Sequence, residues 1–291
     1  MRVWVEAARP RTLVAGAVPV IVGTASSHRF IGWRFAVALL VALALQVAVN
    51  FANDLFDASR GVDTPERVGP RRAVSTGLVT PRQMKVAVGL SLGVAATGGL
   101  ALAVAVGYEL LIVGAASFGA ALAYSGGPRP YGSAGLGEVF VFVFFGVVAT
   151  VGSAYVQSRE IEAVALTAAV PIGLFASAIL VANNLRDIEG DERAGKLTLA
   201  VRLGAPRTRS LFRSLLAVAL AATFAVAATA RSAWPLLGLL AAPATRAPMT
   251  LISRRDAPGL VGALTATARL ELLYGGLLAL GLWLGTRAPW A

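Results

Sequence analysis

The sequence predicts an all-α integral membrane protein, a bundle of about nine transmembrane helices. Of its 291 residues, 57% are hydrophobic and only 14% are charged, whereas about a quarter of the residues in soluble domains are charged. The apolar runs recur along the whole chain, which leaves no room for a separate soluble domain. We therefore expect a single transmembrane domain over residues 1–291.

Each expected helix is an apolar run long enough to cross about 30 Å of hydrocarbon. The first run contains Pro19 and the eighth contains three prolines and Arg246, but membrane helices tolerate such breaks where neighbouring groups satisfy the freed backbone. The second and sixth runs end in asparagine-rich segments, and the fifth follows a Gly-Pro turn. In chain order the runs are 12–27, 35–53, 85–107, 109–125, 136–155, 163–183, 211–230, 233–252 and 270–287.

Lys and Arg in the connections predict the orientation, because cytoplasmic loops carry the excess of these residues. With the N-terminus inside, most of the 26 Lys and Arg residues fall on inside segments. We expect a multi-pass protein of a bacterial cytoplasmic membrane, with its N-terminus and its active-site loops in the cytoplasm. The same bias accounts for the net charge of +11, so no nucleic-acid partner is expected.

The content of metal-binding side chains narrows the chemistry. The chain has no cysteine, and His28 is its single histidine. Disulfides and thiolate metal sites are therefore excluded, and a histidine-based triad or zinc site is untenable. Any metal would be bound by oxygen atoms.

Two short acidic stretches repeat each other. Ala-Asn-Asp-Leu-Phe-Asp (52–57) and Ala-Asn-Asn-Leu-Arg-Asp (182–187) each end an expected helix, one in each half of the chain. Duplicated halves commonly form a site between them. We expect both stretches on the same side of the membrane.

The spacing of the carboxylates predicts a magnesium site. Asp54 and Asp57 are three residues apart and Asp187 and Asp191 are four apart, so each pair shares a helix face if the helix continues through it. Mg²⁺ binds through one or two carboxylates together with substrate phosphate oxygens. We expect these four Asp to be catalytic, with a diphosphate bound by neighbouring cations, namely Arg60, Arg72 and Lys196. The alternative is a pair of solvated loops whose acids and bases bind one another, which the duplication disfavours.

The strings NDLFD (53–57), RAVSTG (72–77) and DIEGDERAGKLT (187–198) resemble the motifs of the UbiA superfamily of intramembrane aromatic prenyltransferases. The resemblance spans almost the entire chain and implies nine helices, with two Asp-rich motifs that hold Mg²⁺ and an isoprenyl diphosphate. Gly61 stands where the last Asp of the first motif would fall, and Asp63 is expected to replace it. The implied metal-binding residues are Asn53, Asp54, Asp57, Asp63, Asn184, Asp187 and Asp191.

Within the superfamily, five segments look most like the branch that prenylates 1,4-dihydroxy-2-naphthoate in menaquinone biosynthesis. That branch transfers a polyprenyl group from polyprenyl diphosphate to the ring with loss of CO₂ and diphosphate, giving demethylmenaquinol. Four residues are expected to bind the aromatic substrate, namely Tyr124, Arg129, Tyr131 and Glu138, with Arg129 on its carboxylate. The segments are ARPRTL (8–13), GVDTPERVGPRRAVSTG (61–77), YSGGPRPYG (124–132), GLGEVFVFVFFG (135–146) and NNLRDIEGDERAGKLTLAVRLG (183–204).

Three alternatives remain open at this point. Another aromatic acceptor, hydroxybenzoate or homogentisate, predicts the same metal site and differs only around residues 124–138. A transporter with repeated halves would place acids near mid-span, whereas here they cluster at helix ends. A CDP-alcohol phosphotransferase would need a DGxxAR-type motif, which the sequence lacks.

Overall fold

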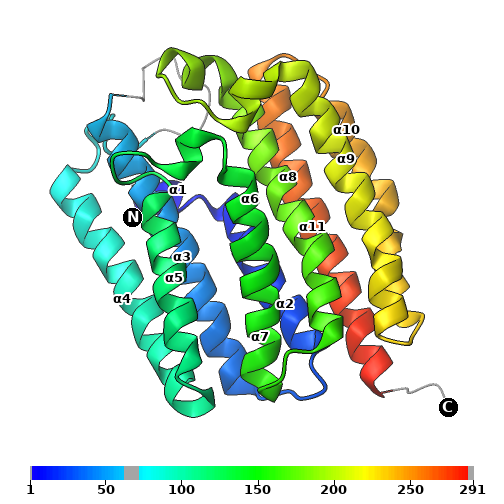
Figure 1. Ribbon diagram of the computed structural model, residues 1–291. Helices are drawn as coiled ribbons and strands as arrows, with labels where there is room; N and C mark the ends of the chain where they lie inside the picture. Colours follow the sequence, from blue (N-terminus) through cyan, green and yellow to red (C-terminus); the bar gives the residue numbers. More distant parts are fainter. Residues whose placement is uncertain (1, 62–71, 288–291) are drawn as a thin grey trace.

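The computed structural model describes residues 2–61 and 72–287, and this part of the chain is helical without strands (Figure 1). A short helix α1 (Arg2–Ala8) and a turn η1 (Pro10–Thr12) precede the bundle. Two spans are composite: α6 (Gly137–Val141), the π-helix η3 (Phe142–Val148) and α7 (Ala149–Ser158) form one, and η4 (Trp234–Thr245) with α10 (Arg246–Leu251) forms the other. The remaining spans are α2 (Leu13–Ser26), α3 (Gly32–Ser59), α4 (Pro81–Val106), α5 (Glu109–Ala123), α8 (Ala163–Arg193), α9 (Leu199–Thr229) and α11 (Ala257–Arg287).

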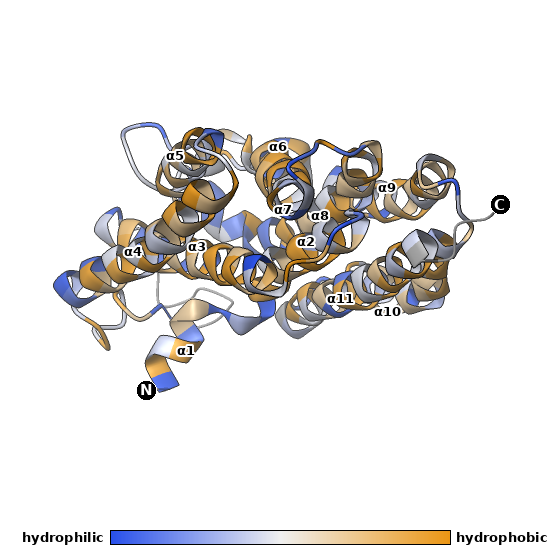
Figure 2. Cartoon of the chain, turned by 90° about the horizontal axis from the view of Figure 1, so that it is seen from below, coloured by the Kyte–Doolittle hydropathy of each residue, from blue (hydrophilic) through white to orange (hydrophobic). Residues whose placement is uncertain are grey.

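These elements match the nine predicted spans over the described residues, so the predicted fold class is confirmed. Six of the helices are long and apolar enough to cross a membrane. Large apolar side chains such as Leu90, Ile112 and Phe224 are exposed, and apolar residues are frequent along the helices (Figure 2). An apolar exterior is what contact with lipid requires.

Several helix ends differ from the predicted ones. Helices α3 and α8 continue past residues 53 and 183 through both acidic stretches, to Ser59 and Arg193. Helices α9 and α11 begin before residues 211 and 270. The predicted spans stopped where charge begins, but a charged residue at the membrane surface does not end a helix. The helix therefore continues through Asp54 and Asp57, as the expectation for this pair required.

Helix α8 forms the centre of the bundle. It packs along α9 and against α11, α2 and the π-helix η3. Phe175 and Ile172 are fully buried in the main apolar core. Gly173 faces Gly146 of η3 so closely that a Cβ on Gly146 would lie 2.6 Å from the Cα of Gly173, a close approach that only small residues permit. The π-helix itself is an uncommon element that is frequent at functional sites.

The C-terminal ends of α3 and α8 lie at the same end of the bundle, the upper end in Figure 1. A side-chain bond links the segments there, from Lys196 just after α8 to Asp57 on α3. The two acidic stretches thus meet on one side, as the repeat predicts.

Candidate active site

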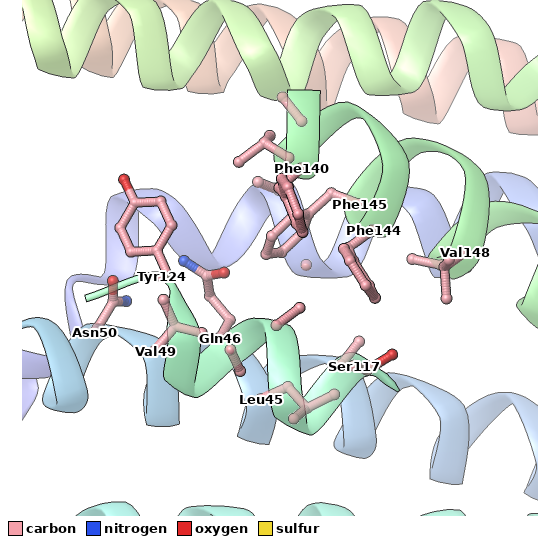
Figure 3. A pocket seen from close by; sticks show the side chains of 18 of the residues that line it. Leu45, Gln46, Val49, Asn50, Ser117, Tyr124, Phe140, Phe144, Phe145 and Val148 are labelled. Atoms are coloured by element: carbon pink, nitrogen blue, oxygen red, sulfur yellow. The ribbon is translucent and has the colours of Figure 1, made fainter. Parts of the chain in front are cut away.

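A cavity of about 570 Å³ runs inside the bundle between α3, α5 and the span formed by α6, η3 and α7. On α3 alone its lining extends from Asp57 back to Ala38, which is about 28 Å at a rise of 1.5 Å per residue. One end is charged, and the rest is mostly apolar and aromatic, with Phe140, Phe144 and Phe145 on one wall (Figure 3).

Asp57 is the centre of the charged end. Its carboxylate accepts a bond of 2.9 Å from the Arg72 guanidinium and one of 2.8 Å from Lys196 Nζ. Asp57 and Arg72 are buried, and all three side chains line the cavity. Asp57, Arg72 and Lys196 lie far apart in the sequence and come together here. The sequence had predicted that these two cations lie near the acidic stretches.

Asp54 has a different position from Asp57. Its carboxylate accepts the backbone N–H groups of Ala73 at 2.8 Å and Val74 at 3.1 Å, and Asp54 does not line the cavity. These bonds hold the segment that carries Arg72 against α3. Two carboxylates on one helix thus bind different groups of this segment, its backbone and the Arg72 side chain.

The second acidic stretch lies on the opposite wall. Asp187 and Asp191 line the cavity together with Asn184. Arg186 binds Asp187 through two parallel bonds of 2.7 and 2.6 Å. Asn184 also donates to Glu138 at 2.9 Å. The carboxylates of both halves thus face one cavity.

Two predicted residues connect α3 to the segment 124–132. Ser125 donates a hydrogen bond to the Asn53 side chain, which lines the cavity. Arg60 is exposed, lies outside the cavity lining and donates to the carbonyl of Gly127 at 2.6 Å. Asp63, the remaining predicted ligand, lies outside the described residues.

Of the four residues expected to bind the aromatic substrate, Tyr124 and Tyr131 line the cavity. Their rings meet edge to face at 5.4 Å, and Tyr131 stacks on Phe140 with centroids 3.9 Å apart. Burial raises the pKa of both hydroxyls, so they stay protonated and can donate hydrogen bonds. Tyr124, Tyr131 and Phe140 form an aromatic wall next to the charged end.

The other two residues do not line the cavity. Arg129 is exposed, because the Gly-Pro turn that precedes it carries its side chain outward. Glu138 is buried against α8, where Asn184 binds its carboxylate and Ser177 donates to its carbonyl. These bonds connect α6 to α8.

Three polar residues that the sequence did not single out as a group lie near the N-terminus of the bundle. Arg9 and Thr12 line the cavity, and Asn50 of α3 bonds to the Thr12 hydroxyl and to the carbonyl of Ala8. The motif ARPRTL (8–13) was the available signal. It did not identify the contacts, because they join segments about 40 residues apart.

The donor atoms at the charged end suit Mg²⁺. Asn53, Asp57, Asn184, Asp187 and Asp191 offer hard oxygen ligands to one cavity. Within the described ranges, however, no group of three carboxylates is arranged as a metal site by itself. This agrees with an ion that takes one or two carboxylates and completes its shell with phosphate oxygens and water.

Comparison with known proteins identifies the family. The UbiA prenyltransferase family matches residues 13–258. This chain belongs to that family. It is 45% identical to the 1,4-dihydroxy-2-naphthoate octaprenyltransferase of Mycobacterium tuberculosis, with 96% of this chain and 97% of the relative covered. It is 37% identical to the Escherichia coli protein of the same name, with 99% and 96% covered.

Solved UbiA structures share the fold. A UbiA homologue from Archaeoglobus fulgidus bound to GPP and Mg²⁺ has a TM-score of 0.68 at 17% identity, over 95% of this chain and 99% of that chain. The apo UbiA homologue from Aeropyrum pernix K1 has a TM-score of 0.68 at 15% identity, over 94% and 97%. At these identities the similarity shows the fold of a multi-pass membrane protein.

Proposed function

We propose that this UbiA family member transfers a polyprenyl group from a prenyl diphosphate to 1,4-dihydroxy-2-naphthoate, releasing CO₂ and diphosphate and giving demethylmenaquinol. One observation carries the proposal: a charged end with Asp57, Arg72 and Lys196 opens directly into a long apolar cavity. A diphosphate with a hydrocarbon tail has the same two parts. The names of the two relatives described above support 1,4-dihydroxy-2-naphthoate as the aromatic acceptor.

The charged end is the proposed diphosphate site. Arg72 and Lys196 stand beside the leaving group and stabilise its charge as it departs. Asn53, Asp57, Asp187 and Asp191 would hold Mg²⁺, which when bound neutralises the diphosphate and favours its departure. The apolar cavity takes the prenyl chain and excludes water from the reacting carbon.

The reaction balances without an oxidant or reductant. The bond between C1 of the prenyl group and the diphosphate oxygen breaks, and its electron pair leaves with the diphosphate. Ring carbon C2 of the acceptor forms the new bond to C1. The carboxylate on C2 departs as CO₂, and its bonding pair restores the aromatic ring. The faces of Tyr124, Tyr131 and Phe140 would stabilise positive charge on the allylic carbon.

We also propose that the protein lies in the bacterial cytoplasmic membrane with the charged end toward the cytoplasm. The excess of Lys and Arg on that side supports this orientation. The orientation is tested by introducing one cysteine at Ser59 or one at Arg159. The labelling of each by a membrane-impermeant thiol reagent is then compared in inverted and right-side-out vesicles.

The activity itself is tested with the purified full chain in detergent. We expect prenylated product and CO₂ from dihydroxynaphthoate with a long prenyl diphosphate, and loss of both products in EDTA. Prenylation of hydroxybenzoate or homogentisate in place of dihydroxynaphthoate would contradict the acceptor, and full activity in EDTA would contradict the metal.

A further inference from the structure

Arg9 reaches the cavity from a segment that precedes the first membrane-spanning helix. It lies in the motif ARPRTL, lines the cavity, and is close enough to Tyr124 for its charge to act on that hydroxyl. Arg9 belongs to neither of the acidic stretches, and it precedes the first of them by more than 40 residues.

The backbone at Arg9 is held in an unusual conformation. Its φ of 52° and ψ of 71° fall in the left-handed region, which glycine adopts freely and which a residue with a side chain adopts only at an energetic cost. Such outliers persist where surrounding contacts fix them, and they cluster at functional sites. A long side chain at a position suited to glycine indicates that the side chain has a use.

A polar network fixes this turn. The Asn50 amide donates to the carbonyl of Ala8 at 2.8 Å and to Thr12 Oγ1 at 3.0 Å, and Gln46 donates to the same hydroxyl at 3.2 Å. The Thr12 hydroxyl and N–H both donate to the carbonyl of Arg9, at 3.0 and 2.9 Å. Asn50 and Gln46 are buried. The chain on both sides of Arg9 is thus bound to α3, and its side chain is directed to the cavity.

The place of Arg9 along the cavity separates it from the diphosphate site. The lining residues described here include three cations, and two of them, Arg72 and Lys196, bind Asp57. Asn50, which holds the Arg9 turn, precedes Asp57 by seven residues on α3, about 10 Å along the helix axis. The turn that carries Arg9 is therefore anchored away from Asp57 along α3, and the Arg9 charge acts on Tyr124 of the aromatic wall.

We propose that Arg9 binds the carboxylate of the aromatic acceptor and makes the site selective for a carboxylate-bearing ring. The inference rests on the proposed function, which supplies the acceptor. A guanidinium matches a carboxylate with two parallel hydrogen bonds, and Tyr124 and Tyr131 offer ring faces and protonated hydroxyls to the same molecule. Arg129, the arginine expected for this task from the sequence, is exposed and outside the cavity lining.

The chemistry predicts which kinetic constant changes. The carboxylate loses its charge as CO₂ leaves, so an ion pair to it stabilises the bound acceptor more than the later decarboxylation. Removal of such an interaction raises KM and leaves kcat nearly unchanged. The KM of the prenyl diphosphate should not respond.

The test compares the wild-type chain with Arg9→Gly and Arg9→Gln, in detergent and with Mg²⁺. Arg9→Gly removes the side chain and suits the left-handed backbone, so it separates loss of the guanidinium from misfolding. The matched control is Arg11→Gln, an exposed arginine two residues further on. The readouts are KM for dihydroxynaphthoate, KM for the prenyl diphosphate, the inhibition constant of 1,4-dihydroxynaphthalene, and the melting temperature.

We expect both Arg9 variants to raise the KM for dihydroxynaphthoate about 10- to 100-fold, as loss of a hydrogen bond to a charged group does. The KM of the prenyl diphosphate and the inhibition constant of the ring without a carboxylate should stay within about threefold, a difference of less than about 0.7 kcal/mol. Arg11→Gln should behave like the wild type.

Three results would overturn the proposal. The first is an unchanged KM for dihydroxynaphthoate in folded Arg9→Gly, and the second is an equal weakening of binding for the ring without a carboxylate. The third is a raised KM for dihydroxynaphthoate in Arg129→Gln with no rise in Arg9→Gln. Each would show that Arg9 does not bind the carboxylate. If the wild-type chain did not accept dihydroxynaphthoate at all, the proposed function would fail together with this inference. A wild-type chain that is active and indifferent to Arg9 would reject the inference alone.

Discussion

The two acidic stretches are similar in sequence and different in their bonds. In the first, Asp57 binds two cations from distant segments, Arg72 and Lys196. In the second, Asp187 binds Arg186, its neighbour on the same helix. The bonds of Asp57 therefore come from separate parts of the chain, whereas the two parallel bonds from Arg186 reach Asp187 from the adjacent residue of its own helix.

This difference teaches that a sequence repeat need not give equal halves of a site. The stretch on α3 determines where the cations lie, because Asp54 holds the segment of Arg72 by its backbone and Asp57 binds the side chain. The stretch on α8 contributes carboxylates and an amide to the cavity, and its Asn184 bonds to Glu138 of α6. Substitutions can show whether the two halves also differ in catalysis and stability.

The largest expected effect comes from the carboxylates that face the cavity. Asp57→Ala and Asp187→Ala should each lower turnover at least about a hundredfold, as loss of a principal charge-stabilising group does. Asp57→Ala should also destabilise the fold, since breaking a buried ion pair costs about 3–5 kcal/mol and Asp57 binds both Arg72 and Lys196. Initial rates and melting temperatures of both purified variants measure these effects. An unchanged melting temperature for Asp57→Ala would contradict the role of its bonds in joining the segments.

A smaller effect is expected for Asp54, which binds backbone rather than facing the cavity. Asp54→Asn should lower turnover about tenfold, because it weakens the bonds that position Arg72, each worth about 1 kcal/mol. In a cycle with Arg72→Ala, most of the Asp54 effect should disappear, since the second change removes the group that Asp54 positions. Full additivity would instead indicate a separate role for Asp54, such as metal binding.

Asp54 also shows how far sequence alone could reach. The lengths of the apolar runs predicted the nine spans, and the repeated stretches predicted that Asp57, Asp187 and Lys196 share one end of the bundle. The direction of each side chain could not be predicted, because the Asp54 carboxylate binds the backbone of Ala73 and Val74, which follow it by about 20 residues. Likewise, the left-handed turn that brings Arg9 to the cavity depends on Asn50, a contact between segments far apart in the chain.

The cations of the two stretches should differ in their effect on the prenyl diphosphate. Lys196→Ala should raise its KM about tenfold with little change for the acceptor, because Lys196 lines the cavity beside Asp57. Arg186→Ala should change it by less than about threefold, because Arg186 binds Asp187 from outside the cavity lining. Steady-state kinetics with each substrate varied in turn distinguish the two. A larger effect for Arg186 would reverse the assignment of the diphosphate site.

The smallest effect is expected for Arg60. Its side chain is exposed and bonds to the carbonyl of Gly127, so Arg60→Ala should change the KM of the prenyl diphosphate by less than about threefold. The same assay serves, with Lys196→Ala as the positive control. A tenfold rise would show that Arg60 contacts the diphosphate, as expected from the sequence.

The bond between Asp57 and Lys196 has a consequence for how the protein is made. The Arg72 partner of Asp57 follows it by 15 residues and the Lys196 partner by 139. At a synthesis rate of about 5–20 residues per second, the first partner emerges about 1–3 s after Asp57 and the second about 7–28 s after it. During membrane insertion the Asp57 carboxylate can therefore first bind Arg72, and the chain must be synthesised beyond residue 196 before its bond to Lys196 can form.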